Sequence, residues 1–436
     1  MEQKQYEIIN AVNAMIDLEL FRKNPQIFKS EINKRGLKID IVSGIELDRK
    51  KRDLILKIDR LRSEKNLASK EIPGLKGEEK NKEISRMKKI NENLKKMEAE
   101  LEDIENKFLI HFSAYPNMSH STTPTGKDES GNVVESYYGK KPEFDFEPKS
   151  HIDLGASLDI LDEKRAAKIS GSRFVFLKNE AVLLEFALVQ YVLSILIDRG
   201  FTPLMPPLLV KEMAMYGTGF FPVEKTQYYK TELDDLFLIG TSEVPLCGYH
   251  SNEFLESSAL PLKYTAFSTC FRREAGSYGK DLGGLFRVHQ FDKIEMFIFA
   301  HPEKSWEEYE GLRNILEEIM QGLGLHYRIV NMCTGDIGTP NAKKYDLEAW
   351  LPGQGNYREL ASCSHDTDFQ ARRLNIKYRD GKKKDLVHTM NSTACAVGRT
   401  LIAIFENYQD SDGKIKIPEV LLPYMGGIKI ISGKKV

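Results

Sequence analysis

The stretch FRREAGSYGKDLGGLFRVHQFDKIEMF, residues 271–297, decides how the rest of the chain is interpreted. It predicts two strands joined by a glycine-rich loop. In the first strand Arg272 and Glu274 are two residues apart, so an extended backbone would point both side chains from one face. The arginine could clamp a carboxylate or phosphate, while the glutamate could accept a hydrogen bond from a purine amine.

The returning strand adds three side chains to the same groove. Phe291 and Glu295 are four residues apart and share a face of an extended strand, with Arg287 on that face as well. An aromatic ring to stack a base, an arginine for phosphate and a buried carboxylate for an ammonium group would then converge. An isolated Arg-x-Glu pair is usually an ordinary surface charge pair, but the complete hairpin is far more specific.

The composition of the chain sets broad limits. Its 436 residues are enough for two or three domains. The net charge of −1 and the pI of about 6.8 give no uniform positive field, so an RNA site has to be a local patch of Lys and Arg. The five cysteines form no CxxC pair, which favours reduced thiols in a cytoplasmic protein over disulfides or a cysteine-rich zinc site.

Two further segments bear on location. The N-terminal segment MEQKQYEIINAVNAMIDLEL lacks a basic start followed by an apolar run, so no secretory or mitochondrial signal is expected. The most apolar run, AVLLEFALVQYVLSILI at residues 181–197, is interrupted by Glu185 and Gln190. It predicts a buried core helix rather than a membrane span, and no membrane partner is expected.

Residues 45–112 predict a long helical hairpin, because apolar residues recur there at steps of three and four among Lys, Arg and Glu. The seam positions of its second half are Met87, Ile90, Leu94, Met97, Leu101, Ile104 and Phe108. Those of its looser first half are Leu47, Lys51, Leu54, Ile58, Leu61, Lys65, Ala68 and Ile72. PGLKG at residues 73–77 permits a tight reversal, so two antiparallel helices should reach on the order of 40 Å.

Such an arm has two candidate roles. Composition alone supports a dimerisation or spacer coiled coil as well as a finger that grips a long nucleic acid, because charged faces are usually only solvated. The side chains predicted to be available to phosphates are Arg49, Lys50, Lys51, Arg52, Arg60, Arg62, Lys88, Lys89, Lys95 and Lys96.

The remainder predicts a second domain of mixed type. Residues 113–139 are rich in Ser, Thr, Pro, Gly and Asn and predict a linker. Beyond it, helical patterns at residues 181–198 and 306–321 alternate with consecutive short β-rich runs, which predicts an α+β domain on a largely antiparallel sheet. No GxxxxGK[ST], GxGxxG or HExxH motif is present, so other groups would have to hold ATP.

Five blocks, in order along the chain, resemble class II aminoacyl-tRNA synthetases and specifically the seryl-tRNA synthetase family. The opening stretch is similar to motif 2, GFTPLMPPLLV at residues 200–210 to motif 1, and HTMNSTACAVGRTLIAIFENYQ at residues 388–409 to motif 3. TSEVPL at residues 241–246 and YRELASCSHDTDFQARRLNIKYR at residues 357–379 are further blocks of this family. The likeness runs from about residue 15 to about residue 427, since MIDLELFRKNPQIFKSEINKRG resembles the family's entry into its arm.

The resemblance implies a class II catalytic domain at residues 121–436, a tRNA-binding coiled-coil arm domain at residues 15–120 and an N-terminal extension at residues 1–14. It implies ATP-dependent activation of L-serine to seryl-adenylate and transfer of serine to the 3′ end of tRNA(Ser), with tRNA(Sec) as a second candidate acceptor. It also implies Mg²⁺, a homodimer through motif 1, and contact of the arm and the loop at residues 275–284 with the tRNA.

The resemblance further implies which residues form the site. Arg272 and Arg399 would be the catalytic groups. Serine would be bound by Thr241, Ser242, Glu243, Arg272, Glu295, Asn391 and Thr393. ATP would be bound by Arg272, Arg273, Glu274, Arg287, Val288, Phe291, Glu359, Leu360, Ala361, Ser362 and Arg399, with Glu359 and Ser362 as magnesium ligands. A site that hydrogen-bonds the serine hydroxyl rejects alanine and glycine, because its own polar groups are otherwise left unpaired.

Several positions depart from the family pattern. Ala361 replaces a common serine, His365-Asp366 replaces the usual Asn-Cys, and Gly283 stands where bacterial members often carry Arg. Thr393 occupies a position that is serine in the bacterial form; it keeps the hydroxyl and adds a methyl group, so serine use is still expected.

Two other functions fit part of the pattern. A carrier-protein ligase would share the catalytic domain but usually lacks a long coiled-coil arm. A non-catalytic paralogue acting as a binding protein would not need Arg272, Glu274, Glu295, Glu359 and Arg399 intact. His289 and His388 are predicted to be structural, and Cys363 and Cys395 are predicted to be neutral buried thiols rather than nucleophiles.

Overall fold

The structure is a computed structural model that describes residues 15–275 and 283–433. The predicted N-terminal extension at residues 1–14 lies outside the described residues, and so does most of the loop predicted to meet the tRNA, residues 276–282. The chain divides into two compact units. One contains residues up to 33 and residues 37–115, and the other contains residues 34–36 and the chain from residue 116 onward.

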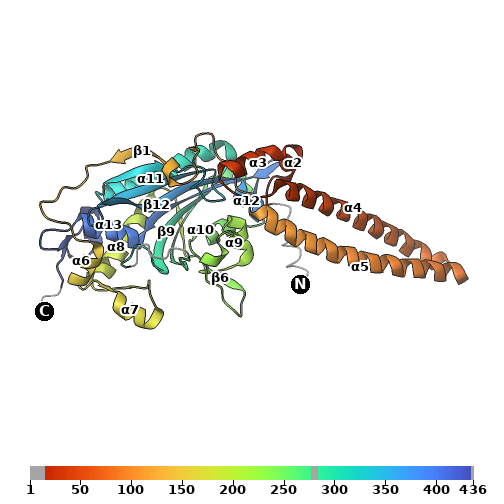
Figure 1. Cartoon of the computed structure of the whole chain (residues 1–436), viewed down its shortest axis with the longest axis horizontal. Helices are drawn as coiled ribbons and strands as arrows, with labels where there is room; N and C mark the ends of the chain where they lie inside the picture. The colour runs from red at the N-terminus through yellow and green to blue at the C-terminus, as the bar shows by residue number, and fades with distance from the viewer. Residues whose placement is uncertain (1–14, 276–282, 434–436) are drawn as a thin grey trace. The chain divides into compact units, whose positions relative to one another are not determined.

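The first unit is the helical arm (Figure 1). Its helices are α2 (Leu18–Lys23), α3 (Pro25–Lys34), α4 (Ile41–Glu71) and α5 (Gly77–Ser113). A 3₁₀ turn at Ile72–Gly74 reverses the chain between the two long helices. The ion pairs Arg62–Glu98 and Arg86–Glu64 show that α4 and α5 run antiparallel, because residues further along α4 meet residues nearer the start of α5.

The seam between α4 and α5 follows most of the predicted heptad positions. Its buried apolar residues are Leu54, Ile58, Ala68, Met87, Ile90, Leu94 and Ile104, with Leu61, Ile72, Met97 and Leu101 packed beside them. Lys51 is only 3% exposed, and its Nζ lies 3.6 Å from the Glu105 carboxylate and 4.6 Å from the centre of the Phe108 ring. The prediction that Lys51 is available to phosphates is therefore wrong. Lys65, also predicted at the seam, is exposed instead.

The base of the arm is held by aromatic packing and one buried carboxylate. Phe21 packs edge-on against Phe28, Phe112 and Tyr115, all of them buried. Asp48 accepts hydrogen bonds from Arg22, at 2.7 Å, and from Arg52, at 2.9 Å. These contacts stabilise the base of the hairpin, where α4 and α5 alone bury little apolar surface.

The second unit is built on an eight-stranded sheet in the order β1-β10-β11-β12-β15-β9-β8-β4. These strands are β1 (Val133–Tyr138), β4 (Thr202–Leu204), β8 (Leu262–Phe271), β9 (Gln290–Ala300), β10 (Tyr327–Asn331), β11 (Lys343–Leu351), β12 (Asn356–Thr367) and β15 (His388–Ala396). All neighbours pair antiparallel except β4 and β8, which are parallel. The predicted α+β fold on a mostly antiparallel sheet is confirmed.

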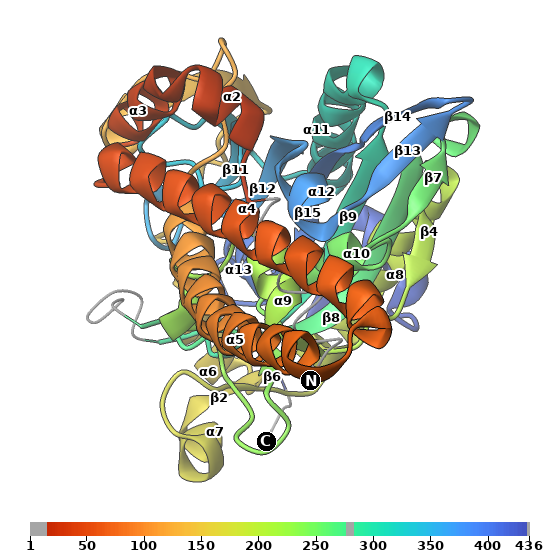
Figure 2. The same cartoon turned by 90° about the vertical axis from the view of Figure 1, so that its right-hand side faces the viewer.

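Helices pack against both faces of this sheet (Figures 1 and 2). Because side chains alternate along a strand, Met296 and Ile298 of β9 enter the core shared with α8 (Glu180–Asp198), α11 (Ser305–Gly322) and α13 (Val397–Asn407). Phe297 and Phe299 face the other way and pack against α10 (Glu243–Gly248) and α12 (Phe369–Leu374).

The remaining elements are short and lie at the margins of the sheet. They are α6 (His151–Ser157), α7 (Glu163–Ser170), α9 (Glu212–Thr218), β2 (Leu161–Asp162), β3 (Phe176–Leu177), β5 (Leu209–Lys211), β6 (Leu236–Leu238), β7 (Phe254–Glu256), β13 (Lys377–Asp380), β14 (Lys383–Leu386), β16 (Ile415–Lys416) and β17 (Ile430–Ile431).

Helix α8 is the predicted core helix. Within residues 15–275 and 283–433 it is the one helix long and apolar enough to be a candidate membrane span. Leu184, Leu188 and Val192 bury one side of it in the core beneath the sheet, as expected for a helix that supports a sheet rather than one surrounded by lipid.

Two predictions about local structure need correction. The segment predicted as a linker, residues 113–139, is tied to the second unit from residue 116 on: the Asn117 amide donates to the Thr339 carbonyl, and β1 pairs with β10 at the sheet edge. The hairpin strands are also shorter than predicted, because β8 ends at Phe271 and β9 begins at Gln290. Glu274 takes a left-handed backbone with φ of 49°, which a regular strand cannot contain.

Candidate functional site

A cavity of about 370 Å³ opens in the second unit, at β8, β9, β12, β15 and the segments that follow them. The predicted site residues that line it are Thr241, Glu243, Arg272, Glu274, Arg287, Val288, Phe291, Glu295, Glu359, Leu360, Ala361, Ser362, Asn391, Thr393 and Arg399. Ser242 and Arg273 do not line it. Ser242 is buried with its hydroxyl toward the Ala266 carbonyl at 3.4 Å, and Arg273 is exposed, its guanidinium 5.7 Å from the Tyr229 ring.

β-Bulges shape this cavity, because an extra residue in one strand re-aims the side chains around it. The register of β12 shifts between Glu359 and Ala361 and again between His365 and Thr367, and that of β15 shifts between Thr393 and Cys395. Site residues therefore lie beside irregularities that strand periodicity alone does not predict.

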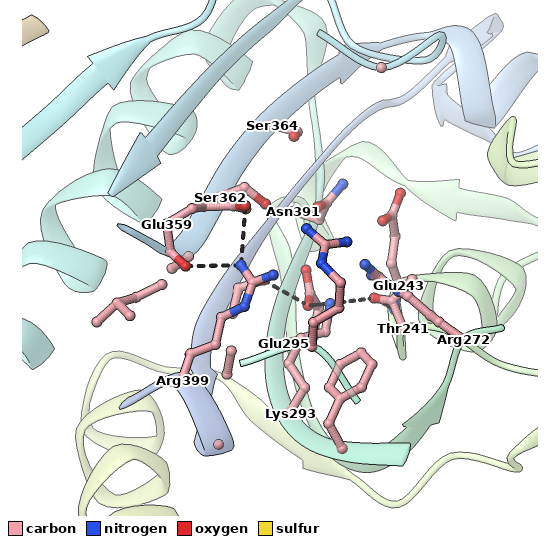
Figure 3. Close-up of a pocket in the computed structure, with 18 of the residues that line it drawn as sticks. Thr241, Glu243, Arg272, Lys293, Glu295, Glu359, Ser362, Ser364, Asn391 and Arg399 are labelled. Atoms are coloured by element: carbon pink, nitrogen blue, oxygen red, sulfur yellow. Dashed lines mark hydrogen bonds and ion pairs between the residues drawn. The ribbon is translucent and has the colours of Figure 1, made fainter. Parts of the chain in front are cut away.

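One end of the cavity is a chain of polar side chains (Figure 3). The Lys293 ammonium donates to the Thr241 hydroxyl at 2.7 Å and forms an ion pair with Glu295 at 2.5 Å. The Thr393 hydroxyl lies 3.5 Å from Glu295 Oε2, the same oxygen that pairs with Lys293, at the limit of a hydrogen bond. This end can receive a ligand that carries both a hydroxyl and an ammonium group.

Glu243 closes the same end from α10. Its carboxylate accepts a hydrogen bond from the Gln370 amide at 2.8 Å, and Gln370 in turn accepts from the Thr389 hydroxyl at 2.8 Å. Burial raises the pKa of Glu243 well above its usual range, and the neighbouring carboxyls of Asp366 and Glu295 raise it further. A buried carboxyl held this way is poised to ionise when a cation arrives.

The other end combines arginines, an aromatic ring and an acidic group. The Arg272 guanidinium lies 5.4 Å from the centre of the Phe291 ring, and its Nε donates to the Gly240 carbonyl at 3.2 Å. The Arg287 guanidinium forms an ion pair with Glu274 at 2.7 Å. An aromatic base could stack on Phe291, and the guanidinium groups of Arg272 and Arg287 could then bind phosphates attached to it.

Arg399, near the start of α13, reaches back over β12. Its Nη1 donates to the Glu359 carbonyl at 2.9 Å and to the Glu359 carboxylate at 3.1 Å, and its guanidinium lies 4.6 Å from the centre of the Phe286 ring. Burial among protein atoms opposes ionisation of Glu359, but the charges of Arg399 and Lys344 outweigh it and lower the pKa to about 2. The side chain is nevertheless 41% exposed to the cavity, so a ligand can reach an ionised carboxylate.

The donors around Glu359 fit a hard cation such as Mg²⁺. Glu359 and Ser362 both present oxygen to the cavity, and Mg²⁺ prefers one or two protein oxygens with the remaining positions filled by phosphate and water. In the described part of the chain no group of three or more His, Cys, Asp and Glu side chains is placed to hold a metal by itself.

Several charged side chains of the cavity form ion pairs. Besides Lys293–Glu295, Arg287–Glu274 and Arg399–Glu359, Lys344 lies 2.9 Å from Asp346 at the cavity wall. Lys293 and Lys344 were missed by sequence reasoning. Lys293 could have been found, because it lies two residues before Glu295 and so shares its face of β9.

The side chains predicted to be structural have structural contacts. His289 packs its Nδ1 against the Arg272 carbonyl at 2.9 Å, and His388 Nδ1 lies 2.8 Å from the Ser305 hydroxyl. Burial raises the pKa of the Cys363 thiol and raises that of Cys395 to about 12. These shifts favour the neutral form of both thiols, in line with the prediction.

Comparison with known proteins gives a consistent result over nearly the whole chain. Residues 15–119 match the model of the seryl-tRNA synthetase N-terminal domain, and residues 223–408 match that of the tRNA synthetase class II core domain (G, H, P, S and T). A serine–tRNA ligase of Oleidesulfovibrio alaskensis is 45% identical over 96% of this chain and 99% of its own length.

Solved structures agree with these matches. Seryl-tRNA synthetase from Pyrococcus horikoshii, complexed with ATP, is 41% identical with a TM-score of 0.86, over 97% of this chain and 100% of that chain. The cytoplasmic serine–tRNA ligase from Naegleria fowleri, in complex with AMP, is 36% identical with a TM-score of 0.81, over 97% of this chain and 99% of that chain.

Proposed function

Because the chain belongs to the seryl-tRNA synthetase family of class II enzymes, we propose that it activates L-serine with ATP and transfers the seryl group to the 3′ end of tRNA(Ser). The observation that carries the proposal is one cavity with two kinds of subsite: an acidic end that suits an amino acid and an end of arginines and Phe291 that suits a nucleotide. The ATP and AMP complexes of the two related structures support the nucleotide assignment.

In the first step an oxygen of the serine carboxylate attacks the α-phosphorus of ATP, and pyrophosphate leaves. Arg272 has its guanidinium near Phe291 and its Nε on the carbonyl of Gly240, the residue before Thr241. It would bind the carboxylate and the α-phosphate and neutralise charge that builds up between them. Arg287 and Arg399 would hold the outer phosphates, while Phe291 stacks on the adenine and Glu274 accepts from its amine. The serine carboxylate and the α-phosphate are thereby held next to each other, so positioning of the two reactants accounts for much of the rate acceleration.

In the second step the terminal ribose hydroxyl of the tRNA attacks the seryl carbonyl. The bond from that carbonyl carbon to the phosphate oxygen breaks, AMP leaves with the phosphate, and the hydroxyl proton is released to water. Glu359 and Ser362 would hold Mg²⁺ in the activation step, and the ion would supply positive charge against the phosphates. The Arg399–Glu359 and Arg287–Glu274 pairs would open as the nucleotide enters, since each partner has a role toward it.

Serine recognition would rest on the acidic end. Thr241 and Glu243 would receive the ammonium group, and Glu295 and Thr393 would bond the side-chain hydroxyl. Alanine would leave the Glu295 carboxylate and the Thr393 hydroxyl short of a partner, and that loss is large in a buried site. Threonine would bring an extra methyl group against the methyl of Thr393.

Pyrophosphate exchange tests this function. Purified protein should exchange labelled pyrophosphate into ATP when serine is present, and to a far smaller extent with threonine, alanine or cysteine. An equal response to threonine or alanine would overturn the substrate assignment, and no exchange with any amino acid would favour a non-catalytic paralogue.

The arm, within the domain proposed to span residues 15–120, would grip the long extra arm of tRNA(Ser) through phosphates. Four exposed lysines of α5 support this role: Lys88, Lys89, Lys95 and Lys96. A variant in which residues 56–100 are replaced by a short glycine-rich turn keeps Lys51, Glu105 and the aromatic base. It should retain serine-dependent exchange and lose tRNA charging by on the order of 100-fold or more. Equal loss of both activities would contradict the assignment.

Acceptor choice is tested by charging purified tRNA(Ser) and tRNA(Sec) in parallel. Replacing the four α5 lysines by glutamate should raise the KM for either tRNA, whereas replacing them by arginine, the matched control, should not. Loss from the arginine variant as large as that from the glutamate variant would mean that the lysines act through packing rather than charge.

A homodimer through motif 1 is proposed, with support from apolar side chains exposed on α7, β3 and α8, the helix that directly precedes motif 1 in the chain. Ile169 is 74% exposed and Phe186 57%, and Phe176, Leu183 and Ile197 are exposed as well. Exposed apolar side chains of this size, with Leu183 and Phe186 on adjacent turns of α8, are typical of a protein–protein interface. The five cysteines are free and buried, which supports the predicted reducing, cytoplasmic location.

A further inference from the structure

Three carboxyl groups surround the end of the cavity assigned to serine, and the third was not among the predicted site residues. Glu243 and Glu295 line the cavity, whereas Asp366 is fully buried behind the lining. Its position is one at which the chain departs from the family pattern, with aspartate in place of the usual cysteine.

Asp366 is bonded to two amides of the lining. Its Oδ1 accepts from Asn341 Nδ2 at 2.7 Å, and its Oδ2 accepts from Asn391 Nδ2 at 3.2 Å. Since Asn391 Nδ2 is committed to Asp366, the oxygen of that amide is the atom left to accept from a ligand. Asp366 thereby fixes the orientation of the Asn391 side-chain amide, with its oxygen toward the cavity side and its nitrogen toward Asp366.

The backbone around Asp366 is held in place. Asp366 is the extra residue of the β-bulge in β12, between the pairs His365–Met390 and Thr367–Thr389. Its carbonyl accepts from Asn117 Nδ2 at 2.7 Å. Arg35 donates to the Asn341 carbonyl at 2.6 Å and also to the Gly338 carbonyl at 2.9 Å, which anchors the segment bearing Asn341.

The charges around Asp366 do not cancel. From β9, Lys293 is already paired with Glu295, and from the segment at residues 34–36 Arg35 partly offsets the acid. From α10, Glu243 faces it with a second carboxyl, and Cys247 beside both is a neutral thiol. The serine end therefore carries more acidic than basic groups, an arrangement that suits a ligand with an ammonium group.

Burial raises the pKa of Asp366 to about 7, and burial together with the charge of Asp366 raises that of Glu243 well above its usual range. These shifts favour the protonated forms of Asp366 and Glu243 when no ligand cation is present. A bound ammonium group would stabilise both ionised forms and expel a proton.

We propose that Asp366 is a positioning residue for serine, which orients the Asn391 amide and makes the serine ammonium group bind in exchange for a proton. The inference rests on the proposed serine site. Protons compete with serine below the range in which Asp366 and Glu243 ionise, so the KM for serine should fall as pH rises and then level off. Without the Asp366 charge, Glu243 ionises at lower pH and this dependence moves to more acidic solution.

Asp366→Asn tests the proposal, with KM and kcat for serine measured by pyrophosphate exchange from about pH 6 to about pH 8. Wild-type KM should fall by up to about tenfold per pH unit below about pH 7. In the variant KM should be raised on the order of tenfold at about pH 8 and be nearly flat with pH, with kcat changed less than about threefold. Unchanged KM and an unchanged pH profile would overturn the proposal.

Two matched variants accompany this measurement. Asp366→Cys, which places the family's usual residue there, should resemble Asp366→Asn. Glu317→Gln removes a different carboxylate, one bonded to Arg313 and Tyr327 away from the cavity, and should keep the wild-type profile. A shift with Glu317→Gln as large as that with Asp366→Asn would mean that any lost carboxylate alters the profile, and would also overturn the proposal.

Calorimetry of wild-type protein is independent of how the variants fold. Serine binding measured near pH 7 in two buffers of different ionisation enthalpy should release close to one proton, and release by Asp366→Asn should be much smaller. No proton release by wild type would overturn the proposal. The proposed function is judged separately, by whether wild-type protein carries out serine-dependent exchange at all.

Discussion

At the scale of single residues, the end of the cavity proposed to bind ATP contains arginines packed against aromatic rings. Arg399 and Arg358 both stack on Phe286, at 4.6 Å and 3.7 Å from the ring centre, but only Arg399 lines the cavity. The two arginines differ in access to a ligand while sharing one aromatic partner. They therefore form a matched pair for mutation.

We expect Arg399→Lys to lower kcat/KM for ATP in pyrophosphate exchange by on the order of 100-fold, because lysine keeps the charge but loses the planar fork. Arg358→Lys should change it less than about threefold. Comparable losses from both substitutions would mean that packing on Phe286, rather than contact with ATP, is what matters.

A second residue-scale prediction concerns Glu185, which lines a smaller cavity next to Phe291 with Asp292. Burial raises the pKa of Glu185 to about 8, and a hydrogen bond and the charge of Asp292 add to the shift. The folded protein thus keeps a proton that the unfolded chain releases above its ordinary glutamate pKa of 4.5. The contribution of Glu185 to stability is complete below that value and is lost as pH rises toward about 8.

Glu185→Gln keeps the size and shape of the side chain but removes its titration, and with it the loss of stability at higher pH. It should raise Tm by about 1–2 °C more at pH 8 than at pH 5, measured by thermal unfolding. An equal Tm change at the two pH values would show that Glu185 does not titrate in this range.

Much of the site could be inferred at the residue scale, and the failures have physical causes. Thr241, Glu295 and Arg399 were placed by likeness to a family whose blocks are contiguous in sequence. Arg272 and Glu274 were predicted on one strand, but the left-handed backbone at Glu274 means that both reach the cavity from an irregular segment. Asn341 and Gln370 were missed because their roles depend on partners brought together by folding, and no local spacing marks them.

At the scale of elements, heptad spacing located the arm but did not predict the buried ion pair between Lys51 and Glu105. Lys51 and Glu105 lie in the seam with little contact to water. A buried pair is weak evidence for stability, but removing one partner leaves a charge without compensation. The pair therefore has its clearest effect on which residues of α4 and α5 can face each other.

Lys51→Met alone should destabilise the arm by about 3 kcal/mol, because Glu105 would remain buried and unpaired. Lys51→Met combined with Glu105→Leu should recover most of that loss. Hydrogen exchange of α4 and α5 backbone amides in the full chain measures both. No recovery in the double variant would mean that Lys51 stabilises the arm through Phe108 rather than through Glu105.

At the scale of the whole molecule, formation of the proposed dimer should depend on the exposed apolar side chains of α8. Phe186→Glu should convert a dimer to monomers by light scattering and lower exchange activity by on the order of tenfold or more, because motif 1 supports the sheet that carries the site. Leu233→Glu is the control, since Leu233 is 94% exposed on a loop. Monomers from wild-type protein would refute the dimer.

The division of the chain into two units has a consequence for how they can be separated. Residues 34–36 count with the catalytic unit although the chain on both sides counts with the arm, and Arg35 bonds there to the carbonyls of Asn117, Gly338 and Asn341. These three hydrogen bonds lie within the second unit, although the chain reaches Arg35 only through residues of the arm. A truncation that starts at residue 116 would remove Arg35 and leave the Asn117, Gly338 and Asn341 carbonyls without it, whereas an internal excision of residues 56–100 keeps all three bonds.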